Sequence, residues 1–325
     1  MLLAALAVAL AWPVPLLLDR ARWVRRAPGT AMVLWQAVAL AGGLSLIGTP
    51  LAWGLSPFGA HLTESVPAVA AAVADGSWTG RLELDPWMPA RIAAVTGAVL
   101  LFSHLVLTLA VTAWRTIAQR RRHRQMVELL AAPPEQRHPG PDGTRVLPHE
   151  VPLAYCLPGL SGSLTVLSQG LIDQLSAPEV GAVVAHERAH LRQRHDLLRL
   201  AFEAWHRAVA WLPTTATARR AVAQLTEMLA DDAALKSHER TDLVRAIVLT
   251  GEAEGLARTG SPGGRAAQTR RAAADNVQQD GSVPLTLRFY RLLDPVPPLP
   301  LALRLAVILA ALVLTALPVV LLLAA

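Results

Sequence analysis

Residues 176–192 read SAPEVGAVVAHERAHLR, and this stretch carries the signals of a capped amphipathic helix. Ser176 is a favourable N-cap, Pro178 fits the first helical turn, and Glu179 stands where a capping box places its acidic residue. The apolar residues before the first histidine continue the helical period. We predict one helix that runs from this cap to about Trp211.

The same helix contains an H-E-x-x-H motif at His186, Glu187 and His190. Residues four apart differ by about 40° around a helix, so both imidazoles face the same way and can bind one Zn²⁺. Glu187 can accept a proton from a water molecule that the metal polarises. The alternative is a surface helix on which Glu187 pairs with Arg188 or Arg194. The helical context favours metal binding, because the motif requires it.

Three residues further along are weaker candidates for a third ligand. Asp196 fits an H-E-x-x-H-x-x-G-x-x-(H/D) pattern, but Gln193 replaces the turn glycine of that pattern. If the helix continues, Asp196 lies about 15 Å along the axis from His186. His195 then lies on the face opposite His186, and His206 is farther still. We expect all three to be solvated or packed on a charged helix.

Glu227 is the better candidate, on a helix predicted over 216–236 that can fold back antiparallel. Asp231 lies one turn later on the same face and can hold a ligand histidine by its distal N–H group. Such a carboxylate pair is weak evidence alone, because helices often display carboxylates to water. Its position after the H-E-x-x-H motif makes it more specific.

The composition is that of a membrane protein with a polar insert. Of 325 residues, 53% are hydrophobic and 17% are charged, against roughly 25% charged in soluble domains. Disordered, collagen-like and disulfide-rich classes are excluded, the last because Cys156 is the only cysteine. Four apolar segments can span a membrane, at about 1–18, 31–55, 92–114 and within 301–325. For the first segment a cleaved signal peptide is the alternative, although no positive residue precedes it.

Arginines predict the orientation of these spans. They fill the first loop and follow the third span, whereas loop 56–91 has mixed charge. The positive-inside rule then places both termini and loop 56–91 outside and the segment 115–300 in the cytoplasm. The net charge of +6 is thereby explained without nucleic acid as a direct partner. The preference for arginine over lysine, with abundant alanine, leucine, proline and valine, resembles a high-GC bacterial genome.

The segment 115–300 is predicted to be mainly α-helical, with a small β-hairpin or edge sheet. Val151–Cys156 and Ser163–Ser168 have the composition of short strands. Further helices are predicted over 115–135, 216–236, 241–256 and 285–293. Residues 258–282 lack an apolar period, and we expect a mobile loop there. A self-cleavage segment or a lid over the site is the functional alternative for this loop.

Three segments, AYCLPG at 154–159, VAHERAH at 184–190 and E-x-x-A-D at 227–231, together resemble the BlaR/MecR-type antirepressor metallopeptidases. The related HtpX and CAAX-prenyl-protease families share the same gluzincin zinc core. The resemblance covers most of the chain, since those antirepressors place the zinc domain between the third and fourth of four spans. It implies one Zn²⁺ per chain, with Glu187 as general base and acid, Asp231 as supporting aspartate, and three ligands: His186, His190 and Glu227.

Two departures from these families matter. BlaR/MecR sensors carry an extracellular penicillin-binding domain after the last span, and this sequence ends at Ala325, so β-lactam sensing is not implied. In HtpX-like relatives a His-Pro pair and a later arginine stabilise the transition-state oxyanion. Here Val283-Pro284 lacks the histidine, and Arg288 is slightly out of register. We expect Arg288 to be either an oxyanion partner or a charge that faces lipid headgroups.

These features predict a zinc endopeptidase with a regulatory role in the bacterial cell membrane. Its partners would be the lipid bilayer and a cytoplasmic protein substrate such as a BlaI/MecI-like repressor; the sequence indicates no oligomeric state. One alternative is an HtpX-like protease for membrane-protein quality control. The other is a non-enzymatic signalling scaffold with a structural zinc, which would normally have four protein ligands rather than three.

Overall fold

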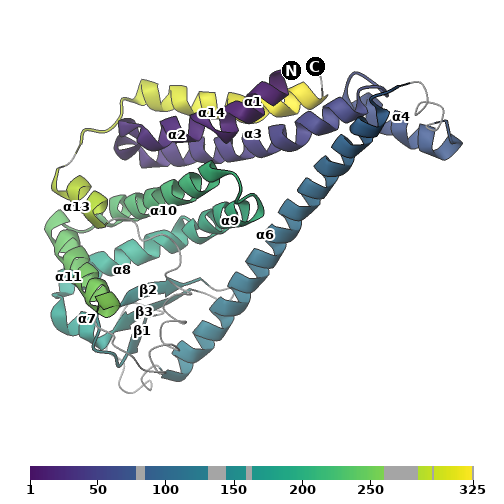
Figure 1. The fold of residues 1–325 in the computed structure, drawn as a ribbon. Helices are drawn as coiled ribbons and strands as arrows, with labels where there is room; N and C mark the ends of the chain where they lie inside the picture. The colour runs from purple at the N-terminus through teal and green to yellow at the C-terminus, as the bar shows by residue number, and fades with distance from the viewer. Residues whose placement is uncertain (78–84, 131–143, 159–162, 260–284, 295, 324–325) are drawn as a thin grey trace. The chain divides into compact units, whose positions relative to one another are not determined.

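The computed structural model describes residues 1–325 except 78–84, 131–143, 159–162, 260–284, 295 and 324–325 (Figure 1). The chain is mainly α-helical with one small sheet, as predicted. It divides into two compact units. The first comprises Met1–Val111, Phe202–Arg219 and Pro298–Ala325, and the second comprises Thr112–Ala201 and Arg220–Pro297.

The first unit consists of long apolar helices. Besides the segment Phe202–Arg219, its elements are α1 (Leu2–Ala11), α2 (Pro13–Arg20), η1 (Arg22–Arg26), α3 (Pro28–Leu55), α4 (Leu62–Asp75), the first part of α6 (Met88–Leu130) and α14 (Leu301–Leu323). Four helical stretches are long and apolar enough to cross a membrane: Leu2–Arg20, Pro28–Leu55, Met88–Val127 and Leu301–Leu323. They coincide with the four predicted spans, whose orientation stays a prediction.

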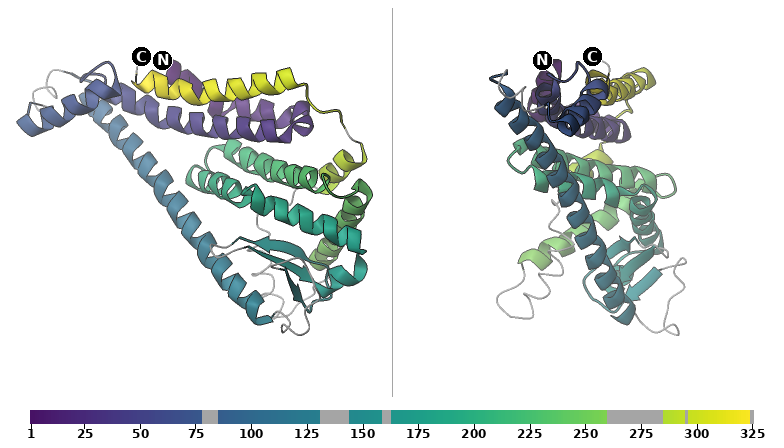
Figure 2. Two further views of the ribbon diagram at one scale, coloured as in Figure 1. Left: turned by 180° about the vertical axis from the view of Figure 1, so that it is seen from behind. Right: turned by 90° about the vertical axis from the view of Figure 1, so that its right-hand side faces the viewer.

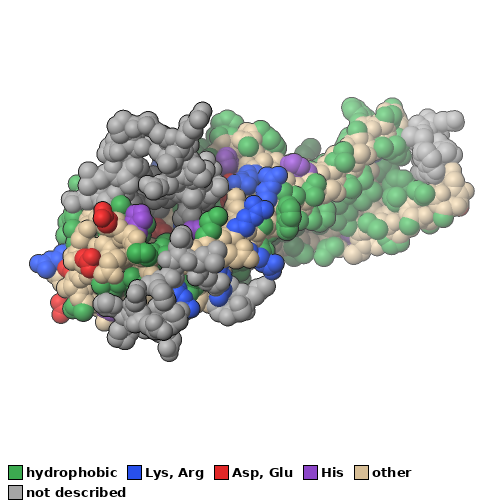
Figure 3. Space-filling view, turned by 90° about the horizontal axis from the view of Figure 1, so that it is seen from below, with side chains coloured by type: hydrophobic (Ala, Val, Ile, Leu, Met, Phe, Trp, Pro, Cys, Tyr) green, Lys and Arg blue, Asp and Glu red, His purple; other side chains and the backbone are tan. Residues whose placement is uncertain are grey.

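Two of these spans differ in detail from the sequence-based expectation. The first is interrupted at Trp12, because the residue before a proline is disfavoured in the helical region. The third continues without a break into the charged segment, so one helix, α6, replaces two predicted ones. Loop 56–91 contains the helix α4, which was not predicted. Figure 3 shows hydrophobic side chains over much of the visible surface of the long helices. Phe102 and Leu309 are among the large hydrophobic residues that are exposed.

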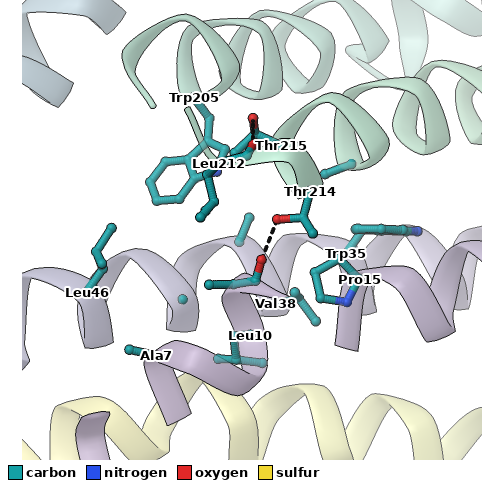
Figure 4. A pocket seen from close by; sticks show the side chains of 14 residues that line it. Ala7, Leu10, Pro15, Trp35, Val38, Leu46, Trp205, Leu212, Thr214 and Thr215 are labelled. Atoms are coloured by element: carbon teal, nitrogen blue, oxygen red, sulfur yellow. Dashed lines mark hydrogen bonds between the residues drawn. The ribbon is translucent and has the colours of Figure 1, made fainter. Parts of the chain in front are cut away.

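A small pocket of about 30 Å³ lies inside the first unit, between α1, α3 and the segment 202–219 (Figure 4). Its lining is almost entirely apolar and includes Trp35 and Trp205. The hydroxyl of Thr214 donates a hydrogen bond to the carbonyl of Ala11. A Cβ at Gly43 would lie 2.9 Å from the Trp205 ring, so this glycine admits the indole against α3.

The sheet of the second unit has three short strands, β1 (Thr144–Leu147), β2 (Ala154–Leu157) and β3 (Leu164–Ser168), in the order β1-β3-β2. Strands β2 and β3 are antiparallel, with Leu157 opposite Leu164, which confirms the predicted hairpin or small sheet. Strand β1, which was not predicted, pairs parallel to β3. Strand β2 therefore lies at one edge of the described sheet.

The other described elements of the second unit are helices. The second unit contains α7 (Gln169–Gln174), α8 (Ala177–Arg192), α11 (Arg240–Thr259), α13 (Leu285–Leu293) and parts of α6, α9 (His195–Ala208) and α10 (Pro213–Ala234). Figures 1 and 2 show α8 between the sheet and α10. The predicted capping box of α8 is present: Glu179 accepts a hydrogen bond from the backbone N–H of Ser176 at 2.7 Å. Leu171, Val184 and Ala246 belong to the apolar core between α7, α8 and α11.

The prediction of one helix from Ser176 to Trp211 is wrong. Helix α8 ends at Arg192 and α9 begins at His195. Arg194 has φ of 52°, the only positive value of a non-glycine residue in the described part of the chain. Neither glycine nor proline marks this break, so no residue at this position indicated it. The left-handed residue changes the chain direction, and the side chains after it no longer follow the helical period of α8.

The predicted loop 258–282 lies almost wholly outside the described residues, since α11 extends to Thr259 and the structure is described again from 285. The short helix predicted over 285–293 is present as α13.

Candidate metal centre

Three potential metal ligands meet between α8 and α10. The Nε2 atoms of His186 and His190 lie 3.2 Å apart, and each lies 3.5 Å from a different carboxylate oxygen of Glu227. Ligand atoms at the corners of a tetrahedron around Zn²⁺, with bonds near 2.1 Å, are separated by about 3.4 Å. The three donors therefore have the types and the spacing that a zinc ion requires, and they form the group that could hold a metal.

The local sequence explains how these side chains meet. His186 and His190 share one face of α8, and the small Ala182 and Ala189 on that helix are fully buried. On α10, Leu225 and Met228 are buried around Glu227. Helix α8 is therefore a core helix, and the alternative of a solvated surface helix is wrong.

Asp231 supports the first histidine of the motif. Its Oδ1 lies 2.9 Å from Nδ1 of His186, and the carboxylate is 1% exposed. An Nδ1–H group that donates to this carboxylate leaves the Nε2 lone pair directed at the other donors. This is the arrangement that the E-x-x-A-D spacing predicted.

Arg288, on α13, contacts the same carboxylates. Its Nε and Nη2 atoms donate to the two oxygens of Asp231 at 3.0 and 2.6 Å, and Nη1 lies 3.1 Å from Glu227. The side chain is 13% exposed, so the expectation of a charge that faces lipid headgroups is wrong. Its role as an oxyanion partner stays a prediction. The neighbouring Arg291 pairs with Asp232 at 2.8 Å and holds α13 on α10.

Burial and opposite charges shift the pKa values of these groups apart. Burial alone would lower the pKa of His186, but hydrogen bonds to Asp231 and Glu227 outweigh it and raise the pKa to about 9. Burial likewise opposes ionisation of Glu227, yet His186 and Arg288 hold the pKa of Glu227 well below its usual range. Burial lowers the pKa of His190 to about 3. Without a metal, a protonated His186 thus lies between two ionised carboxylates.

Glu187 lies beside strand β2. Its carboxylate accepts a hydrogen bond from the backbone N–H of Cys156, and burial raises its pKa to about 7. A carboxylate with this pKa can both take up and release a proton near neutral pH.

The other candidate ligands have different surroundings. Asp196 pairs with Arg120 at 2.8 Å, and His206 Nδ1 lies 2.9 Å from the hydroxyl of Thr215, so neither belongs to the cluster. For His195, the expectation that it lies on the face opposite His186, away from the ligands, is wrong. It is 1% exposed, and its Nδ1 lies 3.0 Å from Nδ1 of His190. The break at Arg194 brings it there, whereas a continuous helix would have turned it away.

Comparison with known proteins supports a peptidase. Residues 117–236 match the family model described as Peptidase family M48, a family of zinc metallopeptidases. No match was found among curated proteins or among solved structures. The matched segment covers little more than a third of the chain and contains the H-E-x-x-H helix and Glu227, whereas Arg288 lies outside it. In the segment that carries the three potential metal ligands, this chain is similar to the M48 metallopeptidases.

Proposed function

We propose that this protein is a zinc metalloendopeptidase embedded in a bacterial cell membrane, with His186, His190 and Glu227 as ligands. The observation that carries the proposal is the spacing of the three donor atoms, on the segment that matches family M48. A bound Zn²⁺ would polarise the scissile carbonyl and make water more acidic. Three protein ligands favour a catalytic site over a structural one, which normally has four.

The side chains around the ligands supply proton transfer and orientation. Glu187 would accept a proton from the attacking water and then pass it to the leaving amine. Its raised pKa, about 7, suits both steps. Asp231 would keep the proton of His186 on Nδ1. Arg288 would balance the charge of the two buried carboxylates and hold Glu227 in place.

Strand β2 is the proposed docking site for the scissile peptide. It lies at an edge of the described sheet, and the N–H of Cys156 contacts the carboxylate of Glu187. An extended peptide that adds to such an edge is held by main-chain hydrogen bonds, with little demand on its sequence. The substrate would therefore be an extended segment of a protein.

We further propose a regulatory role, with the site in the cytoplasm and a BlaI/MecI-like repressor as substrate. This finer assignment rests on the resemblance of the three quoted segments to antirepressor peptidases. Proteomics of a deletion strain distinguishes it from quality control. Loss of a regulatory protease leaves one or a few proteins uncleaved. Loss of a quality-control protease instead causes many misfolded membrane proteins to accumulate.

The substitution Glu187→Gln tests the mechanism. We expect the purified variant to keep its zinc and to lose proteolysis, because glutamine cannot take up the proton. His206→Gln is a matched control on α9 that should leave both properties unchanged. Undiminished cleavage by Glu187→Gln would show that the mechanism is wrong.

A further inference from the structure

The second histidine of the motif has a buried partner that the sequence pattern does not reveal. His195 Nδ1 lies 3.0 Å from His190 Nδ1, and the ring centroids are 4.9 Å apart with an interplanar angle of 81°. On its other side, His195 Nε2 lies 3.2 Å from the side-chain oxygen of Gln193. The three side chains thus form a chain of contacts that starts at the proposed metal ligand.

Only one arrangement of protons satisfies these contacts when a metal is bound. His190 directs Nε2 at His186 and Glu227, so a metal takes that lone pair and the ring proton must sit on Nδ1. The Nδ1–H group then donates to Nδ1 of His195, which must be unprotonated. The single proton of His195 consequently lies on Nε2 and donates to the oxygen of Gln193.

We propose that His195 is a positioning residue that fixes the tautomer and the ring orientation of His190 for metal binding. The inference rests on the proposed zinc site. It assigns to His190 the support that Asp231 gives to His186, with a neutral imidazole in place of a carboxylate. Partners of this kind typically contribute 10–100-fold to metal affinity, because they hold the ligand ring in place.

The backbone is arranged for this contact. Arg194 adopts a left-handed conformation that residues with a side chain rarely adopt, and this turn places the first residue of α9 against the last turn of α8. His195 is 1% exposed there, although the preceding residues Arg192 to Arg194 are exposed.

Two substitutions separate positioning from space filling. In His195→Asn the amide oxygen can take the place of Nδ1 and accept the proton of His190. In His195→Gln most of the volume is kept, but the amide lies near the place of Nε2 and no acceptor remains opposite His190. His206→Gln is the control, because His206 is on the same helix and contacts Thr215 instead.

The zinc affinity of the whole protein in detergent is measured by competition against a chelating dye. The absorption spectrum of the Co²⁺-loaded protein reports ligand geometry, and the melting temperature of the metal-free protein reports folding. We expect His195→Gln to weaken zinc binding about 10–100-fold and to alter the Co²⁺ spectrum. His195→Asn should stay within a few-fold of wild type, and His206→Gln should match it.

Equal affinities and spectra for wild type and His195→Gln would overturn the inference and leave the proposed zinc site intact. Equal losses of affinity and of melting temperature in His195→Asn and His195→Gln would assign His195 a purely structural role and would also overturn it. A wild-type protein that binds neither metal would overturn the proposed function itself, and the inference with it.

Discussion

Zinc binding should release a proton from His186. In the metal-free protein the neighbouring Asp231 and Glu227 raise the pKa of this imidazole to about 9, so it is protonated at neutral pH. A metal needs the Nε2 lone pair and must displace the proton, because Nδ1–H stays bonded to Asp231. The pKa of His190 is lowered and that of Glu227 is also lowered, so neither ligand releases a proton on binding.

The magnitude follows from the difference between this pKa and the pH of the experiment. At a pH about 2.5 units below a pKa of about 9, removal of the proton costs about 3.4 kcal/mol, or about 300-fold in apparent affinity. At pH values below about 7, where a coordinated water is still mostly neutral, the apparent affinity should therefore rise about tenfold per pH unit.

Calorimetric titration with zinc in buffers of different ionisation enthalpy counts the released protons. The Glu187→Gln variant is the best sample, because it removes the titration of Glu187, whose pKa is raised to about 7. Near pH 6.5 a coordinated water, with a pKa of about 7, is still mostly neutral. We expect about one proton per zinc. A value near zero, with an affinity independent of pH, would refute the description of the metal-free site.

Three further substitutions test a buried ion pair, a helix cap and a close packing contact. Arg288→Ala should lower the free energy of unfolding of the metal-free protein by about 3–5 kcal/mol, since it removes a buried cation that contacts both Asp231 and Glu227 and leaves His186 to face the two carboxylates. Added zinc should restore part of this loss in thermal melts; unchanged stability would contradict the pairing. Glu179→Ala should cost about 1 kcal/mol in denaturant titrations by removing the α8 capping box, and no change would rule out that contribution. Gly43→Leu should destabilise the protein by about 1–3 kcal/mol through a clash with Trp205. The additional substitution Trp205→Ala should relieve the clash, and a double variant no better than the sum of the two single ones would argue against it.

Sequence patterns predicted the parts of the site that depend on spacing within one helix. The i, i+4 spacing of His186 and His190 predicted that both lie on one face of their helix. The same spacing predicted that Glu227 and Asp231 share one face of the next helix. The antiparallel return of α10 followed from a short connection between two helices. These predictions needed no knowledge of tertiary packing.

The remaining contacts depend on packing and on a local backbone conformation. Arg288 reaches the carboxylates because α13 docks on α10, a long-range contact that follows from no local pattern. His195 was misplaced because the turn at Arg194 adopts a left-handed conformation without the glycine that usually signals it. Strand β1 was missed because its pairing with β3 joins residues about twenty positions apart, a contact that no local pattern indicates.

The proposed zinc site with His186, His190 and Glu227 as ligands is best tested by the metal content of the purified protein, with Glu227→Ala and Asp196→Ala measured beside the wild type. We expect about one zinc per chain in the wild type and in Asp196→Ala, and loss of the metal in Glu227→Ala. Loss of zinc in Asp196→Ala with retention in Glu227→Ala would contradict the ligand set, and absence of zinc from the wild type would contradict the proposed function.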